Sequence, residues 1–312
     1  MNKVDMIEQT IFETKKDLMK IILSDKTTGL FIRWTTNIYS ENGPEYVASQ
    51  EIKPELITGK NINLIQPRVA KRQEEQVKRT REKAEVFTPA WLCNRQNNLI
   101  DEEWFGKRDV FNYAIDGGWI TNTNSIGFPK GKNWKQYVDA RRLEISCGEA
   151  PYLVSRYDMV SGNYIPIGER IGLLDRKLRI VNENTNDEEE WFTWTKRAFQ
   201  SIYGYDYQGD NVFLARENLL YTFIENIVEK FECKPTLIQL KQIVNIIVWN
   251  IWQMDGLTMT APYSEAEPLY EQMTIFDYLG ECKKERSTIP CRIYDWRANC
   301  SLEFRSMVNG EK

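Results

Sequence analysis

From about residue 138 onwards, short strand-like runs alternate with longer helix-like runs, and this alternation limits the fold more than any other feature. In chain order we predict a strand at 140–146, a polar insertion at 158–190, a helix at 191–200, a strand at 201–207, helices at 211–231 and 237–247, and a strand at 248–254. Thr236 and Gln239 form a capping box before the last helix. Strands separated by helices are typical of a parallel sheet, so the sequence predicts an α/β fold.

The residues before this alternation show a different pattern of predicted elements. We predict a helix at 4–23, strands at 28–36 and 45–52, a charged helix at 69–85, and an irregular segment rich in Trp, Asn and Gly at 90–135. The chain is therefore divided into an N-terminal α+β extension, 1–85, and a main domain, 86–312. With 42% hydrophobic residues it has enough apolar material for one large domain or for a domain with an accessory lobe.

The composition excludes several kinds of chemistry. The 312 residues contain no histidine, which removes Ser-His-Asp and Cys-His catalysis and histidine-ligated metals. The six cysteines form no C-x-x-C pair, so we expect no metal site. No apolar run approaches the roughly 20 residues that span a bilayer, and the first residues lack the pattern of a signal peptide. We therefore expect a cytoplasmic protein without membrane contact.

A basic stretch at 67–83 interrupts the overall acidic balance of the chain, whose net charge is −4. Phosphate groups of nucleic acid bind such stretches. The side chains that we predict to contact DNA are Arg72, Lys78, Arg79 and Arg81. The alternative is a solvated helix with internal ion pairs, which the interspersed glutamates fit equally well.

One acidic residue lies at or just beyond the end of each predicted strand: Glu144, Asp206 and Asp255. In an open α/β sheet the ligand crevice lies outside the carboxyl ends of the strands. An adenosine-type ligand needs such acceptors for its ribose hydroxyls and for its exocyclic amine. Gly148 would let the backbone approach the ligand closely. The alternative is structural, because Asp206 could cap the next helix and Asp255-Gly256 could form a turn.

The order of these motifs resembles the gamma class of DNA N6-adenine methyltransferases, the modification subunits of restriction–modification systems. Phe87-Thr88-Pro89 is similar to the family's Phe/Tyr-Thr-Pro motif. Glu144-x-x-x-Gly148-x-Ala150 is similar to its first S-adenosylmethionine (SAM) motif, with alanine in place of the last glycine. The second and third motifs resemble 201–206, followed by 215–219 (ARENL), and 250–257.

This resemblance implies a Rossmann-like SAM-dependent methyltransferase fold with SAM as cofactor and DNA as partner. Phe87, Thr88 and the 146–150 loop with Cys147 and Gly148 would hold the methionine part of SAM. Asp206 would accept hydrogen bonds from the ribose hydroxyls, and Asp255 one from the adenine amine. Thr88-Pro89 has a structural alternative as a helix stop.

The catalytic Asn/Asp-Pro-Pro-Tyr/Phe motif of the family has no match in this chain. Asp295 and Trp296, after Tyr294, offer an acceptor and an aromatic residue without the prolines, and Pro262-Tyr263 is a weaker candidate. The sequence thus favours an adenine methyltransferase, or a degenerate relative that a partner subunit completes. The alternatives are a non-catalytic DNA-binding or assembly subunit, and a methyltransferase that acts on a small molecule or a protein.

Overall fold

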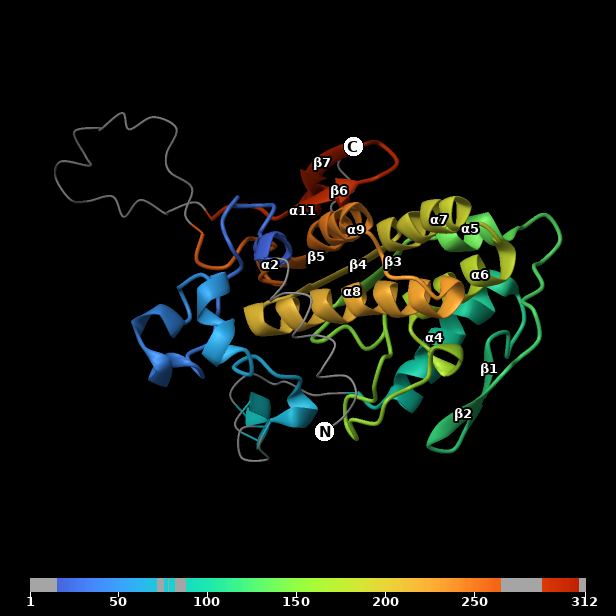
Figure 1. Cartoon of the computed structure of the whole chain (residues 1–312), viewed down its shortest axis with the longest axis horizontal. Helices are drawn as coiled ribbons and strands as arrows, with labels where there is room; N and C mark the ends of the chain where they lie inside the picture. Colours follow the sequence, from blue (N-terminus) through green and yellow to red (C-terminus); the bar gives the residue numbers. More distant parts are fainter. Residues whose placement is uncertain (1–15, 72–75, 78, 82–87, 265–287, 309–312) are drawn as a thin grey trace.

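A three-stranded parallel sheet lies at the centre of the computed structural model, which describes residues 16–71, 76–77, 79–81, 88–264 and 288–308 (Figure 1). Its strands are β3 (Arg142–Ile145), β4 (Ile202–Asp206) and β5 (Ile251–Gln253), paired in the order β3-β4-β5. Ile145 pairs with Tyr205, and Asp206 with Gln253. The predicted mixed α/β architecture with a parallel sheet is confirmed. The third strand is shorter than predicted because the preceding helix continues to Asn250.

Four helices connect the three strands. They are α6 (Leu173–Asn184), α7 (Glu188–Gln200), α8 (Gly209–Phe231) and α9 (Leu237–Asn250). Helices α7, α8 and α9 pack against β4, and α8 lies along the sheet in Figure 1. The predicted capping box is present, since the Thr236 hydroxyl accepts from the Gln239 amide and the Gln239 side chain accepts from the Thr236 amide.

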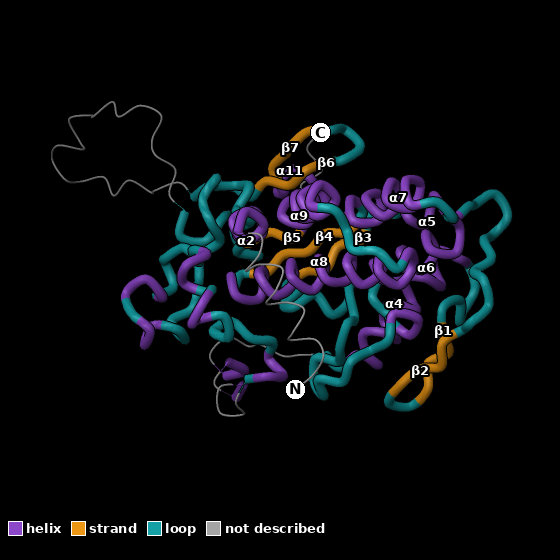
Figure 2. Tube along the Cα trace, in the orientation of Figure 1, coloured by secondary structure: helices purple, strands orange, loops and turns teal. Residues whose placement is uncertain are grey.

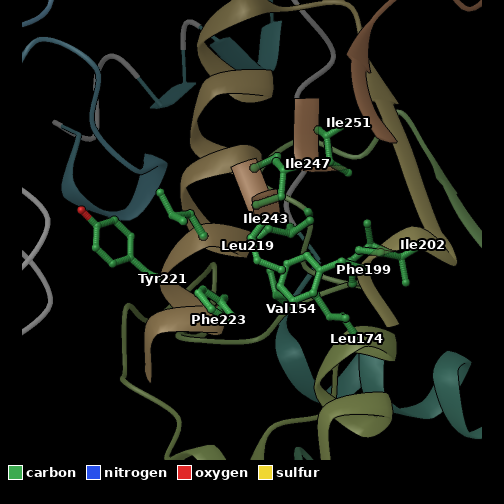
Figure 3. Packing of buried hydrophobic residues seen from close by; sticks show 14 of the residues in the cluster. Val154, Leu174, Phe199, Ile202, Leu219, Tyr221, Phe223, Ile243, Ile247 and Ile251 are labelled. Atoms are coloured by element: carbon green, nitrogen blue, oxygen red, sulfur yellow. The ribbon is translucent and has the colours of Figure 1, made fainter. Parts of the chain in front are cut away.

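The main core lies between the sheet and these helices (Figure 3). Ile202 of β4 and Ile251 of β5 point toward Leu219 of α8 and Ile247 of α9, and all four are fully or almost fully buried. The alternate residues of the strands point to the other side, where Tyr203 and Trp252 form a second apolar cluster. This alternation follows from the two-residue period of a strand.

The second cluster is covered by the C-terminal hairpin. Strands β6 (Arg292–Asp295) and β7 (Cys300–Glu303) pair in antiparallel fashion and lead into α11 (Phe304–Val308). Ile293 and Phe304 pack against Trp252 there. Figure 2 shows the hairpin on the side of the sheet away from α8. The hairpin therefore covers the face that the connecting helices leave open.

Two helices occur where the sequence analysis predicted irregular or polar chain. Helix α4 (Ala90–Phe105) replaces the predicted irregular segment, and α6 lies inside the predicted polar insertion. Both predictions were wrong. The buried face of α4 is largely polar, whereas α6 buries Leu174, Leu178 and Val181 at helical spacing, a pattern that the interpretation as a polar insertion overlooked. Asn94, Asp101 and Arg176 are almost fully buried and bond to one another or across the interface. Apolar periodicity cannot find a helix whose buried face carries charges and amides.

The remaining elements of this region are short. They are the antiparallel hairpin β1 (Asn112–Ile115) and β2 (Gly118–Thr121), helix α5 (Trp134–Asp139), and the 3-10 turn Ile167–Glu169.

Among its described residues, the N-terminal part contains helix α2 (Lys16–Leu23), helical residues at 76–77 and 79–81 within the predicted charged helix, and little other regular structure. Short 3-10 turns follow at Ser40–Asn42, Pro44–Tyr46, Pro54–Leu56, Gly59–Asn61 and Arg68–Ala70. The predicted strands at 28–36 and 45–52 are reduced to isolated bridges, such as that between Arg33 and Glu51. Trp34 and Ile52 still donate to the Gln50 and Ile32 carbonyls, whereas the Arg33 amide donates to Gln253 Oε1 at 2.8 Å.

The N-terminal part and the sheet region share one apolar core, which includes Leu18, Trp34 and Ile247. The proposed boundary near residue 85 stays a prediction, and it falls among residues outside the described part. Within the described ranges, no helix combines the length and the apolar character that crossing a bilayer requires.

Candidate functional site

The carboxyl ends of β3 and β4 meet at one edge of the sheet, and the loop after β3 closes against the end of β4. The Cys147 amide donates to the Tyr205 carbonyl at 2.8 Å. The Gly148 amide donates to Asp206 Oδ2 at 2.9 Å. Two of the three predicted strand-end acids and the predicted ligand loop therefore lie at the same edge. We call Glu144, the 146–150 loop and Asp206 the carboxyl-edge site.

The loop has an unusual backbone. Ser146, Gly148 and Ala150 have positive φ values of 49°, 54° and 64°, and the two residues between them do not. Side chains other than glycine rarely adopt such values, and they cluster at ligand-binding and other functional sites. Cys147 contributes only its backbone to the edge, because its sulfur packs toward Gly204, where an added Cβ would lie 3.3 Å away. Burial raises the pKa of the Cys147 thiol well above its usual value, so it is no nucleophile.

Glu144 is the buried acid of this site. Its Oε1 accepts from the Tyr152 amide at 3.4 Å, and among the described residues Oε2 has no hydrogen-bond partner. Burial raises the pKa of Glu144 well above its usual value, and the amides of Tyr152 and Leu153 offset only part of this effect. Buried polar atoms in native proteins almost always have a partner. The free oxygen of Glu144 therefore marks a place for a donor.

Asp206 ends β4 and is already bonded at both oxygens. Oδ1 accepts from the Gln208 amide at 2.9 Å and from Asn211 Nδ2 at 3.4 Å, whereas the one donor to Oδ2 among the described residues is the Gly148 amide. Burial raises the pKa of Asp206 to about 6, although these donors act in the opposite direction. Since each carboxylate oxygen has two acceptor positions, Oδ2 keeps one for a ligand.

A buried ion-pair cluster lies next to Asp206, at the beginning of α8. Arg79 is fully buried and its Nη1 lies 2.7 Å from Oδ2 of Asp210. Lys71 lies 3.7 Å from the same oxygen, and the Tyr39 hydroxyl donates to it at 2.8 Å. Arg79 also donates to Asn211 at 3.3 Å, so this cluster adjoins the carboxyl-edge site.

This cluster changes the interpretation of the basic stretch. The guanidinium of Arg79 is enclosed by the protein and paired with a carboxylate, so it is not presented to a phosphate backbone as predicted. The alternative of a solvated helix with internal ion pairs does not describe Arg79 either, because Arg79 is fully buried and its partner Asp210 belongs to α8. Arg81 is exposed, and its contact with DNA phosphate stays a prediction. Arg72 and Lys78 lie outside the described residues.

Thr88 lies beside the loop that follows β3. It is hydrogen-bonded to the Tyr152 side chain, and Cys93 donates to its carbonyl at 3.7 Å. Because the Tyr152 amide bonds to Glu144, Thr88 lies near the carboxyl-edge site, as its predicted role requires. Phe87 lies outside the described residues.

Asp255 follows β5 and has a clear structural role. Its Oδ1 accepts from the Leu257 amide at 2.8 Å and from the Thr258 amide at 3.3 Å, which is the pattern of a side-chain-closed turn. The structural alternative, that Asp255-Gly256 forms a turn, is therefore confirmed, whereas binding of a ligand by Asp255 stays a prediction. Nearby, Tyr263 is hydrogen-bonded to Tyr207, which places Pro262-Tyr263 at the carboxyl edge as well.

Asp295 and Trp296 lie at the opposite edge of the sheet. Asp295 pairs with Arg141 at 2.9 Å, and Trp296 donates to Asn250 at 2.8 Å. Arg141 precedes β3 and Asn250 precedes β5, so both contacts lie at the amino ends of the strands. At about 3.3 Å per residue, β3 separates this edge from the 146–150 loop by roughly 15 Å. Asp295 and Trp296 therefore lie far from a ligand bound at the carboxyl edge, and their catalytic role stays a prediction that this geometry does not support.

Several residues of the site were not found from the sequence. Asp210 and Asn211 follow the predicted acid closely, and a Gly-Asp-Asn run at the start of a helix is the only local signal for them. Glu149 accepts from the Arg68 amide at 2.8 Å and from the Tyr157 hydroxyl at 2.7 Å. Such long-range partners leave no pattern in the sequence.

The chain matches none of the known family models, curated proteins or solved structures with which it was compared.

Proposed function

We propose that the chain binds SAM at the carboxyl-edge site, as a Rossmann-like relative of DNA adenine methyltransferases. The observation that carries this proposal is the contact of the Gly148 amide with Asp206 across two adjacent parallel strands. It joins the loop after the first strand to the acid at the end of the second, which is where an α/β sheet binds an adenosine-type ligand.

The residues fit the two polar ends of SAM to different degrees. The unpartnered Oε2 of Glu144 suits the ammonium group of the methionine part, because a buried carboxylate with a raised pKa gains most from a cationic donor. Oδ2 of Asp206 can accept one ribose hydroxyl in addition to the Gly148 amide. Asp255 fits the adenine amine less well, since its turn already uses one carboxylate oxygen.

Catalysis by the chain alone has weaker support than binding. A methyl acceptor amine needs fixed hydrogen-bond acceptors close to the sulfonium, and Asp295 and Trp296 lie at the other edge of the sheet. We propose that a partner subunit supplies these groups. The second candidate, a non-catalytic assembly or DNA-binding subunit, is favoured by the absence of the family's Asn/Asp-Pro-Pro-Tyr/Phe motif from the sequence.

Isothermal titration tests the binding proposal. We expect SAM and S-adenosylhomocysteine to bind at one site, and Glu144→Gln to weaken binding about tenfold, because it replaces a charge-assisted bond by a neutral one. Asp295→Asn is the matched control, since it removes the same charge at the amino edge and is expected to leave the affinity unchanged. Absence of heat at millimolar ligand, or equal weakening by both variants, would contradict the proposal.

A further inference from the structure

Three adjoining cavities form a furrow at the amino edge of the sheet. The largest, about 590 Å³, lies between α5 and α7. Another, about 150 Å³, lies between β3, β4 and the C-terminal hairpin. The third is a constriction too narrow to hold a water molecule, and it shares Asp139, Arg197 and Gln200 with the first and Arg141 and Tyr203 with the second. The three adjoin through these shared residues, and we call them the amino-edge furrow.

The furrow is strongly basic in a chain whose net charge is −4. Two carboxylates line it, Asp139 and Asp295, and they pair with arginines. Among the described residues, Lys135, Lys196 and Arg142 form no ion pair. The basic side chains that line the furrow are Lys135, Lys196, Arg197, Arg297, Arg141 and Arg142. Arg197 lies in the last turn of α7, where it also stabilises the helix dipole, but this role does not explain the other five.

Aromatic rings accompany these cations along the furrow. Trp194 lines the largest cavity and is half-buried, and its ring contacts that of Trp134 at 4.8 Å. The Lys135 ammonium lies 4.9 Å from the centre of the Trp194 ring. Tyr294 and Trp296 continue the series at the narrow end, with ring centres 4.5 Å apart. Cations and aromatic rings thus lie together at both ends of the furrow.

We propose that the amino-edge furrow binds single-stranded nucleic acid. Proteins that bind single strands combine a basic groove, which follows the phosphates, with aromatic rings on which unpaired bases stack. A free phosphate would use the cations and leave the rings without a role. A duplex presents no base face to Trp194, because its bases are stacked on one another.

This furrow is separate from the carboxyl-edge site. Since β3 lies between the two sites, a single-stranded nucleic acid held in the furrow does not reach Gly148. The inference therefore does not depend on SAM binding, and the failure of one proposal leaves the other standing.

Fluorescence anisotropy with a labelled 12-nucleotide oligothymidylate tests the inference. We expect Trp194→Ala to weaken binding about tenfold through loss of stacking. Lys135→Gln with Lys196→Gln should weaken binding and make the salt dependence shallower, because each lost phosphate contact lowers the logarithmic slope by about 0.7. Lys20→Gln with Lys60→Gln is the matched control, since both lysines are exposed on other parts of the chain.

A duplex of the same length and thymidine monophosphate are the competitors. We expect the unlabelled single strand to compete well, and the duplex and the mononucleotide to compete at least tenfold less well. Because Lys135 is exposed and Lys196 is half-buried without an ion pair among the described residues, the lysine variants keep the test valid if Trp194→Ala affects folding. The inference is wrong if the oligonucleotide does not bind, if the furrow and control variants behave alike, or if the duplex competes as well as the single strand.

Discussion

Replacing Asp210 by alanine is expected to lower the free energy of unfolding by about 3–5 kcal/mol, the usual effect of removing one partner of a buried ion pair. Asp210 and Arg79 are both fully buried, and Lys71 is almost so. The variant leaves two cations inside the protein without their carboxylate, and the Tyr39 hydroxyl without its acceptor. Urea unfolding at neutral pH measures the effect.

The pH dependence and a double variant test the cause of this loss. Burial alone would raise the pKa of Asp210, but Arg79 and Lys71 more than offset it and bring the pKa from 3.8 to about 2. The ion pair therefore stabilises the fold fully above about pH 4 and less as the pH falls toward 2. The difference between wild type and Asp210→Ala should shrink over this range. Adding Arg79→Met should restore part of the lost stability, and a further loss of similar size would contradict the account.

Replacing Asp101 by alanine is expected to cost a similar amount, about 3–5 kcal/mol. Asp101 joins three elements, since it pairs with Arg176 of α6 and accepts from the Tyr137 hydroxyl of α5 at 2.7 Å. Arg176 also donates to Asn94 at 2.7 Å, on the same helix as Asp101. Without the carboxylate, α4 and α6 meet around a buried guanidinium that lacks its counter-charge. Thermal and urea unfolding should both report the loss.

Glu102→Ala is the control for this prediction, because it removes the neighbouring carboxylate on the same helix. Glu102 pairs with Arg108, whose side chain is 79% exposed, and exposed pairs contribute little to stability. We expect no measurable change. Equal destabilisation by the two variants would show that α4 is sensitive to any change of charge. The buried network would then contribute no more to the free energy of unfolding than the exposed pair.

The parallel sheet could be predicted from the sequence because its signals are local. Ile202 and Tyr203 begin a strand that lies between helices with clear apolar periodicity. The capping box of Thr236 marks the start of α9. Helix α4 could not be predicted in this way. Its buried residues Asn94 and Asp101 gain their partners from α6 and β1, more than ten residues away along the chain.

The candidate site was predictable only in part. Parallel strands have their carboxyl ends at the same edge of the sheet, so the sequence alone places Glu144, Gly148 and Asp206 at one edge. Arg79 and Asp295 could not, because their positions depend on how segments far apart in the sequence pack. A basic stretch looks the same in the sequence whether it faces solvent or pairs with Asp210 inside.

Hydrogen exchange with and without S-adenosylhomocysteine is the most direct test of the central claim that the carboxyl-edge site binds the adenosyl ligand. The account predicts slower exchange of the amides of Gly148, Tyr152 and Leu153, and unchanged exchange in α5 and α7 beside the amino-edge furrow. Unchanged exchange at 148–153 under saturating ligand, or slower exchange only at the amino edge, would contradict it.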